Sequence, residues 1–215
     1  MKTIQYTLLS ILFVFASCKN SGEKSAAEQA LTDSEKIDEI SETADLESDA
    51  KKRYEVKSGT IVYTAPMGVV QTLTWDNYGL MEVFVTELEM AGITSKDIQI
   101  RRDGYQYSFK AGETTGTKTK WYTNDMHFSK MDMEAMKKYK VKKLADETIA
   151  GRKCEKYSAE FGGSPMTTWV WGNIMMKTIT KFGTGEMIIE ATKIEEGPVA
   201  ASIFEIPANI TFSEV

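Results

Sequence analysis

Few residues in this 215-residue sequence could perform chemistry. His127 is the single histidine, which excludes metal sites built on two histidines and leaves little material for a catalytic triad. Cys154 lies among the basic residues of GRKCEKY, which could lower the pKa of a reactive thiol; a small buried core cysteine is the alternative. The stretch FGGSP, residues 161–165, lacks the glycine spacing of a nucleophile elbow. We therefore expect no catalytic residues, no metal and no cofactor.

Cys18 stands in a different pattern. Lys2 provides a positive charge, the apolar run IQYTLLSILFVFA follows, and Phe15 and two small residues then precede the cysteine. This order looks like a bacterial lipobox, and it predicts a signal peptide over residues 1–17 and lipidation of Cys18. Two or three acyl chains hold a protein firmly, at about 0.8 kcal/mol for each buried methylene. The alternative is a soluble secreted protein whose cysteine falls there without being lipidated.

Residues 18–53 predict a flexible acidic tether that begins at the lipidated cysteine. From residue 19 onward this stretch contains 10 acidic and 6 basic residues and no aromatic residue, so it cannot bury enough apolar surface to fold alone. As a coil it would span about 30 Å. The net charge of −5 gives no indication of a nucleic-acid partner.

Residues 54–215 have the alternating pattern of β-strands separated by turns. Asp103-Gly104 is a two-residue hairpin signal, and only MEAMKKY and its neighbours favour a helix, at about 132–140. We expect a mainly β domain, a curved antiparallel sheet or incomplete β-barrel of about nine to eleven strands with one central helix. An immunoglobulin-like sandwich is the alternative.

The order of YEVKSG, RDGYQY, TWVWGNIMMK, ATKIEE and FEIPANI resembles a family of lipoproteins found mainly in Bacteroidota, whose domain is grouped with the LolA/LolB-like fold. The resemblance covers most of residues 54–212. It implies a curved sheet wrapped around helical material, with an apolar interior that receives acyl chains in LolA and LolB. It also implies a cell-envelope location, with the outer membrane as the default and the membrane face undecided.

Period-two counting places a set of large apolar side chains on one face of this sheet. The candidates for contact with an apolar ligand are Trp75, Tyr107, Phe109, Trp121, Trp169, Trp171 and Met187, with Leu73, Tyr105 and Ile189 beside them. The ligand would be an acyl chain, a lipid or a lipoprotein, bound without catalysis. The alternatives are a structural or interaction lipoprotein whose core these residues fill, and a lipid-anchored hydrolase.

Overall fold

The described part of the chain forms one open β-sheet. The computed structural model describes residues 52–90, 92–122, 128 and 131–215, which all belong to the second of the two units into which the chain divides, residues 39–215. The strands are β1 (Gly59–Thr64), β2 (Val70–Asp76), β3 (Met81–Met90), β4 (Ile93–Arg102), β5 (Tyr105–Lys110), β6 (Thr115–Lys120), β7 (Lys142–Ile149), β8 (Arg152–Phe161), β9 (Ser164–Trp171), β10 (Ile174–Phe182), β11 (Gly185–Glu196) and β12 (Thr211–Glu214).

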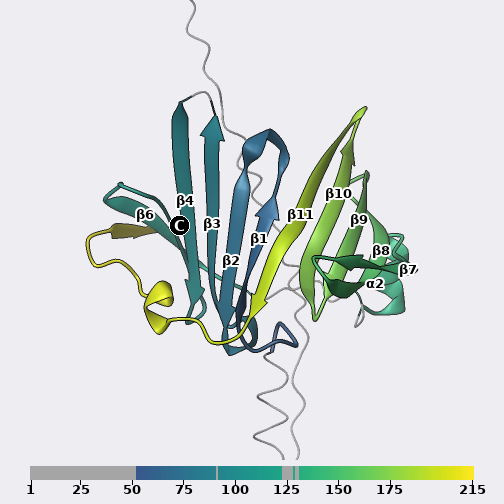
Figure 1. Cartoon of the computed structure of the whole chain (residues 1–215), viewed down its shortest axis with the longest axis horizontal. Coiled ribbons are helices and arrows are strands. Elements are labelled where there is room, and N and C mark those ends of the chain that lie inside the picture. The colour runs from purple at the N-terminus through teal and green to yellow at the C-terminus, as the bar shows by residue number, and fades with distance from the viewer. Residues whose placement is uncertain (1–51, 91, 123–127, 129–130) are drawn as a thin grey trace, which may run out of the picture. The chain divides into compact units, whose positions relative to one another are not determined.

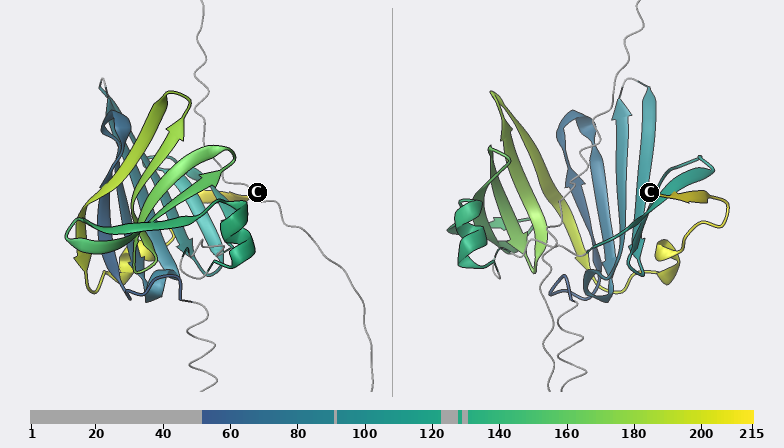
Figure 2. Two further views of the ribbon diagram at one scale, coloured as in Figure 1. Left: turned by 90° about the vertical axis from the view of Figure 1, so that its right-hand side faces the viewer. Right: turned by 180° about the vertical axis from the view of Figure 1, so that it is seen from behind.

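The twelve strands follow the order β12-β6-β5-β4-β3-β2-β1-β11-β10-β9-β8-β7. Neighbours are antiparallel, except that β12 pairs with β6 in parallel. The sheet curves strongly and its two edges, β12 and β7, do not join (Figures 1 and 2). The predicted curved, incomplete barrel is confirmed, with one strand more than the upper expectation, and the single sheet excludes the sandwich.

Local sequence accounts for the turns and for the helix. Asp103 and Gly104 both have positive φ, 53° and 76°, as a two-residue hairpin turn requires. The helix α2 (Met133–Lys138) begins after Asp132, whose Oδ1 accepts a hydrogen bond from the Ala135 N–H at 2.7 Å. It packs near the β7 edge of the sheet, because Met136 joins Tyr157 of β8, the strand next to β7, in a hydrophobic cluster.

The inner face of the sheet is the face that carries Ile61, Leu73 and Trp75 on β1 and β2. These side chains form one cluster with Trp169 of β9 and with Ile174 and Met176 of β10. The cluster therefore joins β1 and β2 to β9 and β10, which lie on the other side of β11 in the sheet order. This cluster is the main core of the domain.

The opposite, outer face of β3–β5 is covered by the segment that follows β11. Phe204, in the short helix η4 (Ala201–Phe204), is 1% exposed and packs on Val83 and Ile100. Phe212 of β12 makes edge-on contacts with Tyr107 and Phe109, with ring centroids 5.2 and 6.0 Å apart. Both faces of this part of the sheet therefore carry side chains with specific partners.

Gly59 is required by close packing at the start of β1. A Cβ at this position would lie 2.6 Å from the carbonyl oxygen of Glu195 and 2.7 Å from Cη2 of Trp75. We predict that Gly59→Ala lowers the free energy of unfolding by about 1–3 kcal/mol, since neither the strand backbone nor a buried indole can yield freely.

Gly185, at the start of β11, is the matched control. A Cβ added at Gly185 would have the carbonyl oxygen of Phe182 as its nearest neighbour, at 3.7 Å, which is an ordinary van der Waals contact. Gly185→Ala should change the free energy by less than about 0.5 kcal/mol in the same urea titration. Equal effects of the two substitutions would contradict the packing argument.

Candidate functional site

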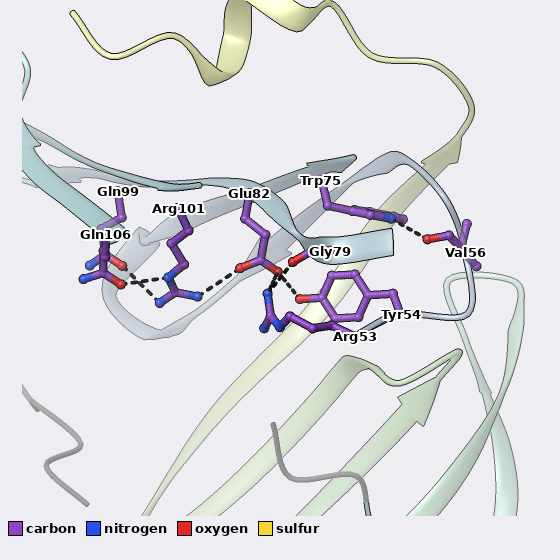
Figure 3. Close-up of polar contacts among 9 residues, drawn as sticks. All are labelled: Arg53, Tyr54, Val56, Trp75, Gly79, Glu82, Gln99, Arg101 and Gln106. Atoms are coloured by element: carbon purple, nitrogen blue, oxygen red, sulfur yellow. Dashed lines mark hydrogen bonds and ion pairs between the residues drawn. The ribbon is translucent and has the colours of Figure 1, made fainter. Parts of the chain in front are cut away.

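A buried carboxylate organises the polar part of the inner face (Figure 3). Glu82 of β3 is 1% exposed. Its Oε1 lies 2.7 Å from the Arg53 guanidinium and accepts a hydrogen bond from the Tyr54 hydroxyl, while its Oε2 lies 3.1 Å from the Arg101 guanidinium. We call these four residues the Glu82 cluster. One carboxylate thus binds two arginines from segments that are distant in the sequence.

The turn between β2 and β3 holds the N-terminal side of this cluster. The Tyr78 carbonyl accepts hydrogen bonds from the backbone N–H groups of Arg53 and Tyr54, each at 3.0 Å. Tyr78 has a φ of 57°, a left-handed conformation that is costly for a bulky residue. The Gly79 carbonyl accepts a further bond from the Arg53 side chain at 2.8 Å. The strained turn therefore presents two carbonyls to the incoming chain.

Arg101 is the member of the cluster that reaches solvent, with 28% of its side chain exposed. Its Nε donates to Gln106 at 2.7 Å, and one terminal nitrogen lies 3.4 Å from the Gln99 side-chain oxygen. The Trp121 ring lies near both arginines, with its centroid 5.6 Å from Arg101 and 4.5 Å from Arg53. The exposed edge of the cluster is therefore a guanidinium flanked by amides and an indole.

Burial sets the protonation state of the cluster's hydroxyl. Burial, followed by the charge of Glu82, raises the pKa of Tyr54 well above its ordinary value. Tyr54 therefore stays a neutral hydrogen-bond donor to the carboxylate. Within the described part of the chain, every buried side-chain nitrogen and oxygen has a hydrogen-bond partner.

The inner face changes from apolar to polar across the strands. One row of paired residues runs through Ile194, Ile61, Leu73, Phe84, Gln99, Ser108, Thr117 and Ser213, from β11 to β12. Its first four members are hydrophobic and its last four carry amides or hydroxyls. The Glu82 cluster lies in the next row toward the β2–β3 turn, because Trp75, Glu82, Arg101 and Gln106 are paired there. We call the first row the amphipathic row.

An open depression of about 430 Å³ lies at the polar end of the amphipathic row. Gln99, Ser108, Thr117 and Ser213 line it, together with Asp97, Lys110, Ile98, Phe109, Glu113, Thr115 and Gly116. Its volume is within the range of small-molecule sites, about 300–1,000 Å³, but hydroxyls, an amide and charges make up much of its wall. Such a lining favours a ligand that has a polar portion.

Three of the four tryptophans predicted to face a ligand are part of the core or its border. Trp75 is 0% exposed and donates its indole N–H to the Val56 carbonyl at 3.0 Å. Trp169 is 4% exposed and donates to Glu147 at 2.8 Å, and Trp171 packs against the same cluster. Their packing agrees with the core interpretation, and their contact with a ligand stays a prediction.

The expectation that all of the candidates share one face is wrong. Tyr107 and Phe109 alternate with Gln106 and Ser108, so they point to the outer face, where Phe212 covers them. Trp121 does lie with the inner-face arginines. Met187 is half-buried on β11, paired with Thr180. Period-two counting fails here because it gives relative sides within one strand and does not relate distant strands.

The structure tests the prediction for Cys154 but not the one for His127. Cys154 is 0% exposed, and burial raises its pKa, which contradicts the reactive-thiol alternative. His127 and Cys18 lie outside the described residues. Within the ranges described, no three potential metal ligands cluster, and no helix is long and apolar enough to cross a membrane.

Three residues of the Glu82 cluster are not singled out by the sequence pattern. Arg53 falls in the segment assigned to the tether, and Glu82 and Arg101 occur at ordinary alternating positions of charged strands. The available signal was weak: Glu82 alternates with Phe84 on the side that must face the core. A charge on the buried side of a strand requires a partner, and the partners come from other segments.

Comparison with known proteins supports the fold. No family model and no curated protein matches this sequence. Among solved structures, the chain is similar to an uncharacterized conserved protein from Thermus thermophilus, with a TM-score of 0.53 and 6% identity over 80% of this chain and 99% of that one. At such low identity the likeness concerns the fold alone.

Two further structures have lower TM-scores. One is MucB in complex with MucA(peri), with a TM-score of 0.39 and 14% identity over 78% of this chain and 60% of that one. The other is LprF from Mycobacterium bovis, with a TM-score of 0.36 and 13% identity over 76% and 93% of the two chains. Likenesses of this degree carry no inference about this chain, and the family resemblance drawn from the sequence stays a prediction.

The Glu82 cluster yields a stability prediction. Glu82→Gln keeps the shape of the side chain but removes the counter-charge that two guanidinium groups share. We expect the free energy of unfolding to fall by about 3 kcal/mol, the lower end for breaking a buried ion pair, because Arg101 is partly solvated.

Glu87→Gln, on the same strand, is the control. Its ion pair with Lys96 is exposed, with a distance of 3.0 Å, so its loss should cost less than about 1 kcal/mol. Both variants are compared by chemical denaturation at neutral pH. A cost of Glu82→Gln no larger than that of Glu87→Gln would show that the cluster does not stabilise the fold.

Proposed function

We propose that this chain is a lipid-anchored protein of the cell envelope, attached through acyl chains on Cys18, with the outer membrane as its expected location. The positive charge, apolar run, small pair and cysteine at the N-terminus support this proposal. Because each acyl chain adds many buried methylenes, the anchor would hold the protein at the membrane without any spanning segment. The β domain would then act at or near a membrane surface.

The half-barrel then binds an amphipathic ligand, a lipid or an acylated protein, without catalysis. The amphipathic row carries this proposal: the half-buried Phe84 gives way to Gln99 and Ser108 across adjacent strands of one face. A wholly apolar ligand would leave the amides and hydroxyls without partners, whereas a ligand with a polar head group would match both parts. Two cationic side chains lie on the polar side, Lys110 in the depression and Arg101 in the neighbouring row. The planar guanidinium of Arg101 suits a carboxylate or phosphate head group.

A second function has its own supporting observation. Trp75, Ile61 and Met176 are each 0% exposed, and they fill the space between β1–β2 and β9–β10. If the whole interior is packed in this way, the chain is a structural or interaction lipoprotein. In that case the apolar half of the amphipathic row belongs to the packed core, its polar half faces water, and the row holds no ligand.

The anchor is tested by metabolic labelling with an alkyne-bearing palmitate in cells that express the full chain. We expect label on the wild type and its complete loss in Cys18→Ser, together with release of the protein from the membrane fraction. Cys154→Ser is the control, because the Cys154 thiol is buried and should carry no label. Label that persists in Cys18→Ser would contradict the anchor.

Ligand binding is tested with two photoactivatable probes of equal acyl length, a fatty acid and its neutral glycerol ester, added to envelope membranes that contain the full chain. We expect both probes to crosslink to the inner face. Arg101→Gln should reduce crosslinking of the carboxylate probe at least about tenfold and that of the ester little, because a charge-assisted hydrogen bond contributes about 1.5–3 kcal/mol.

Arg102→Gln is the matched control for this experiment. Arg102 follows Arg101 directly but points to the other face, where it donates to the Phe204 carbonyl at 3.1 Å. It should leave the crosslinking of both probes unchanged. Absence of crosslinks from either probe to the inner face would favour the solid-core function, and equal loss of both probes in Arg101→Gln would contradict head-group recognition.

A further inference from the structure

Exposed apolar side chains gather at one end of the sheet. The described residues include eleven exposed large hydrophobic side chains, and five of them belong to three hairpins. These five are Met67 in the turn between β1 and β2, Val70 at the start of β2, Met90 at the end of β3, Ile93 at the start of β4 and Phe182 at the end of β10. We call them the apolar rim.

The strand pairing brings the three hairpins together. The strands β4-β3, β2-β1 and β11-β10 are consecutive in the sheet order. Val70 pairs with Glu87, three residues before Met90, and Thr64 pairs with Glu190, five residues after Gly185. The three turns therefore lie at the same end of the strands, with the outer two hairpins extending further than the one between β1 and β2, and Figure 1 shows all three at the upper side of the sheet.

Two of these side chains in particular contribute little to the packing of the fold. Met67 is 72% exposed and Ile93 is 66% exposed, so neither packs on the core. Met67 also has a φ of 63°, a conformation that costs free energy for a residue other than glycine. Isolated exposed hydrophobic residues are ordinary, but a group on three adjacent turns indicates a contact surface.

We propose that the apolar rim inserts into the interfacial region of the lipid bilayer to which the chain is anchored. The rim consists of separate projecting side chains rather than a continuous flat patch, and a fluid bilayer can receive each one independently. Glu89, Lys181 and Glu186 flank them, so the charges are of both signs and no anionic lipid is required. Side chains of this size gain free energy on entering the headgroup and acyl boundary.

The position of the tether allows this orientation. The described chain begins at the end of the strands opposite the rim, because Arg53 bonds to the turn between β2 and β3. The ten residues of β3 span about 33 Å, and residues 19–52 as a coil would span about 30 Å. The anchor would therefore keep the rim at a high effective concentration near the bilayer, so weak insertion suffices. This inference rests on the proposed anchoring for that concentration.

The test uses the full lipidated chain in phosphatidylcholine vesicles that contain a shallow spin-labelled lipid. An environment-sensitive fluorophore is attached through Thr184→Cys, next to the rim, or through Lys57→Cys, at the opposite end; the native Cys154 is buried. We expect quenching at position 184 and not at position 57, independent of salt. Ile93→Ser combined with Phe182→Ser should lower the insertion constant at least about tenfold.

Met133→Ser is the control for loss of an exposed apolar side chain, since Met133 is 86% exposed but lies on α2, away from the rim hairpins. It should leave the quenching unchanged, and thermal unfolding checks that each variant is folded. A protein that stays with the vesicles without quenching at position 184 overturns the rim proposal alone. Quenching that survives the double substitution, or self-association through the rim in place of quenching, also overturns it.

Failure of the anchoring has a separate signature, because the protein would then leave the vesicle fraction. The labelled chain is in that case titrated with the same vesicles from solution. Saturable quenching at position 184 supports the rim, and absence of quenching overturns it.

Discussion

The arrangement of the domain depends on the carboxylate of Glu82. A buried carboxylate is costly by itself, and in this fold its cost is offset by two guanidinium groups and a tyrosine hydroxyl. Because Arg53 precedes β1 while Arg101 lies on β4, the cluster fixes the entry of the chain against the middle of the sheet. The same contacts bring Arg101 to the inner face with part of its guanidinium still solvated, so one interaction both stabilises the fold and prepares a polar surface.

The two faces of β3–β5 differ because different distant segments pack on them, the segment after β11 on the outer face and Arg53 and Tyr54 on the inner face. The segment after β11 places Phe204 and Phe212 on the outer face, and this excludes Tyr107 and Phe109 from the interior. On the inner face the pairing of Phe84 with Gln99 marks a change from apolar to polar residues. A continuous sheet can carry such a gradient because each strand contributes one residue to a row. The residues that neighbouring strands contribute to the same row can therefore differ in polarity.

The sequence was sufficient to predict the sheet, the helix and most of the turns, because these follow from local periodicity and turn chemistry. Asp103-Gly104 and the helix after Asp132 are examples in which a few adjacent residues determine the backbone. The site could not be predicted in the same way. Glu82 becomes informative only when its partners are known, and the outward direction of Tyr107 depends on a segment about one hundred residues later in the chain. Register between distant strands is a long-range property, and alternation within a strand does not contain it.

If the proposed ligand binds, the Glu82 cluster would couple the stability of the domain to occupation of the inner face. Arg101 shares its carboxylate partner with Arg53, and its remaining polar contacts are neutral amides. The Arg101 guanidinium shares the Glu82 carboxylate with the Arg53 guanidinium. An anionic group bound beside Arg101 would therefore give Arg101 a second counter-charge. Any ligand that binds the folded state alone stabilises it by mass action, in proportion to the logarithm of its concentration relative to its dissociation constant. Binding of an anionic amphiphile beside Arg101 would therefore raise the stability of the whole folded domain, including the contacts that Arg53 and Tyr54 make with Glu82.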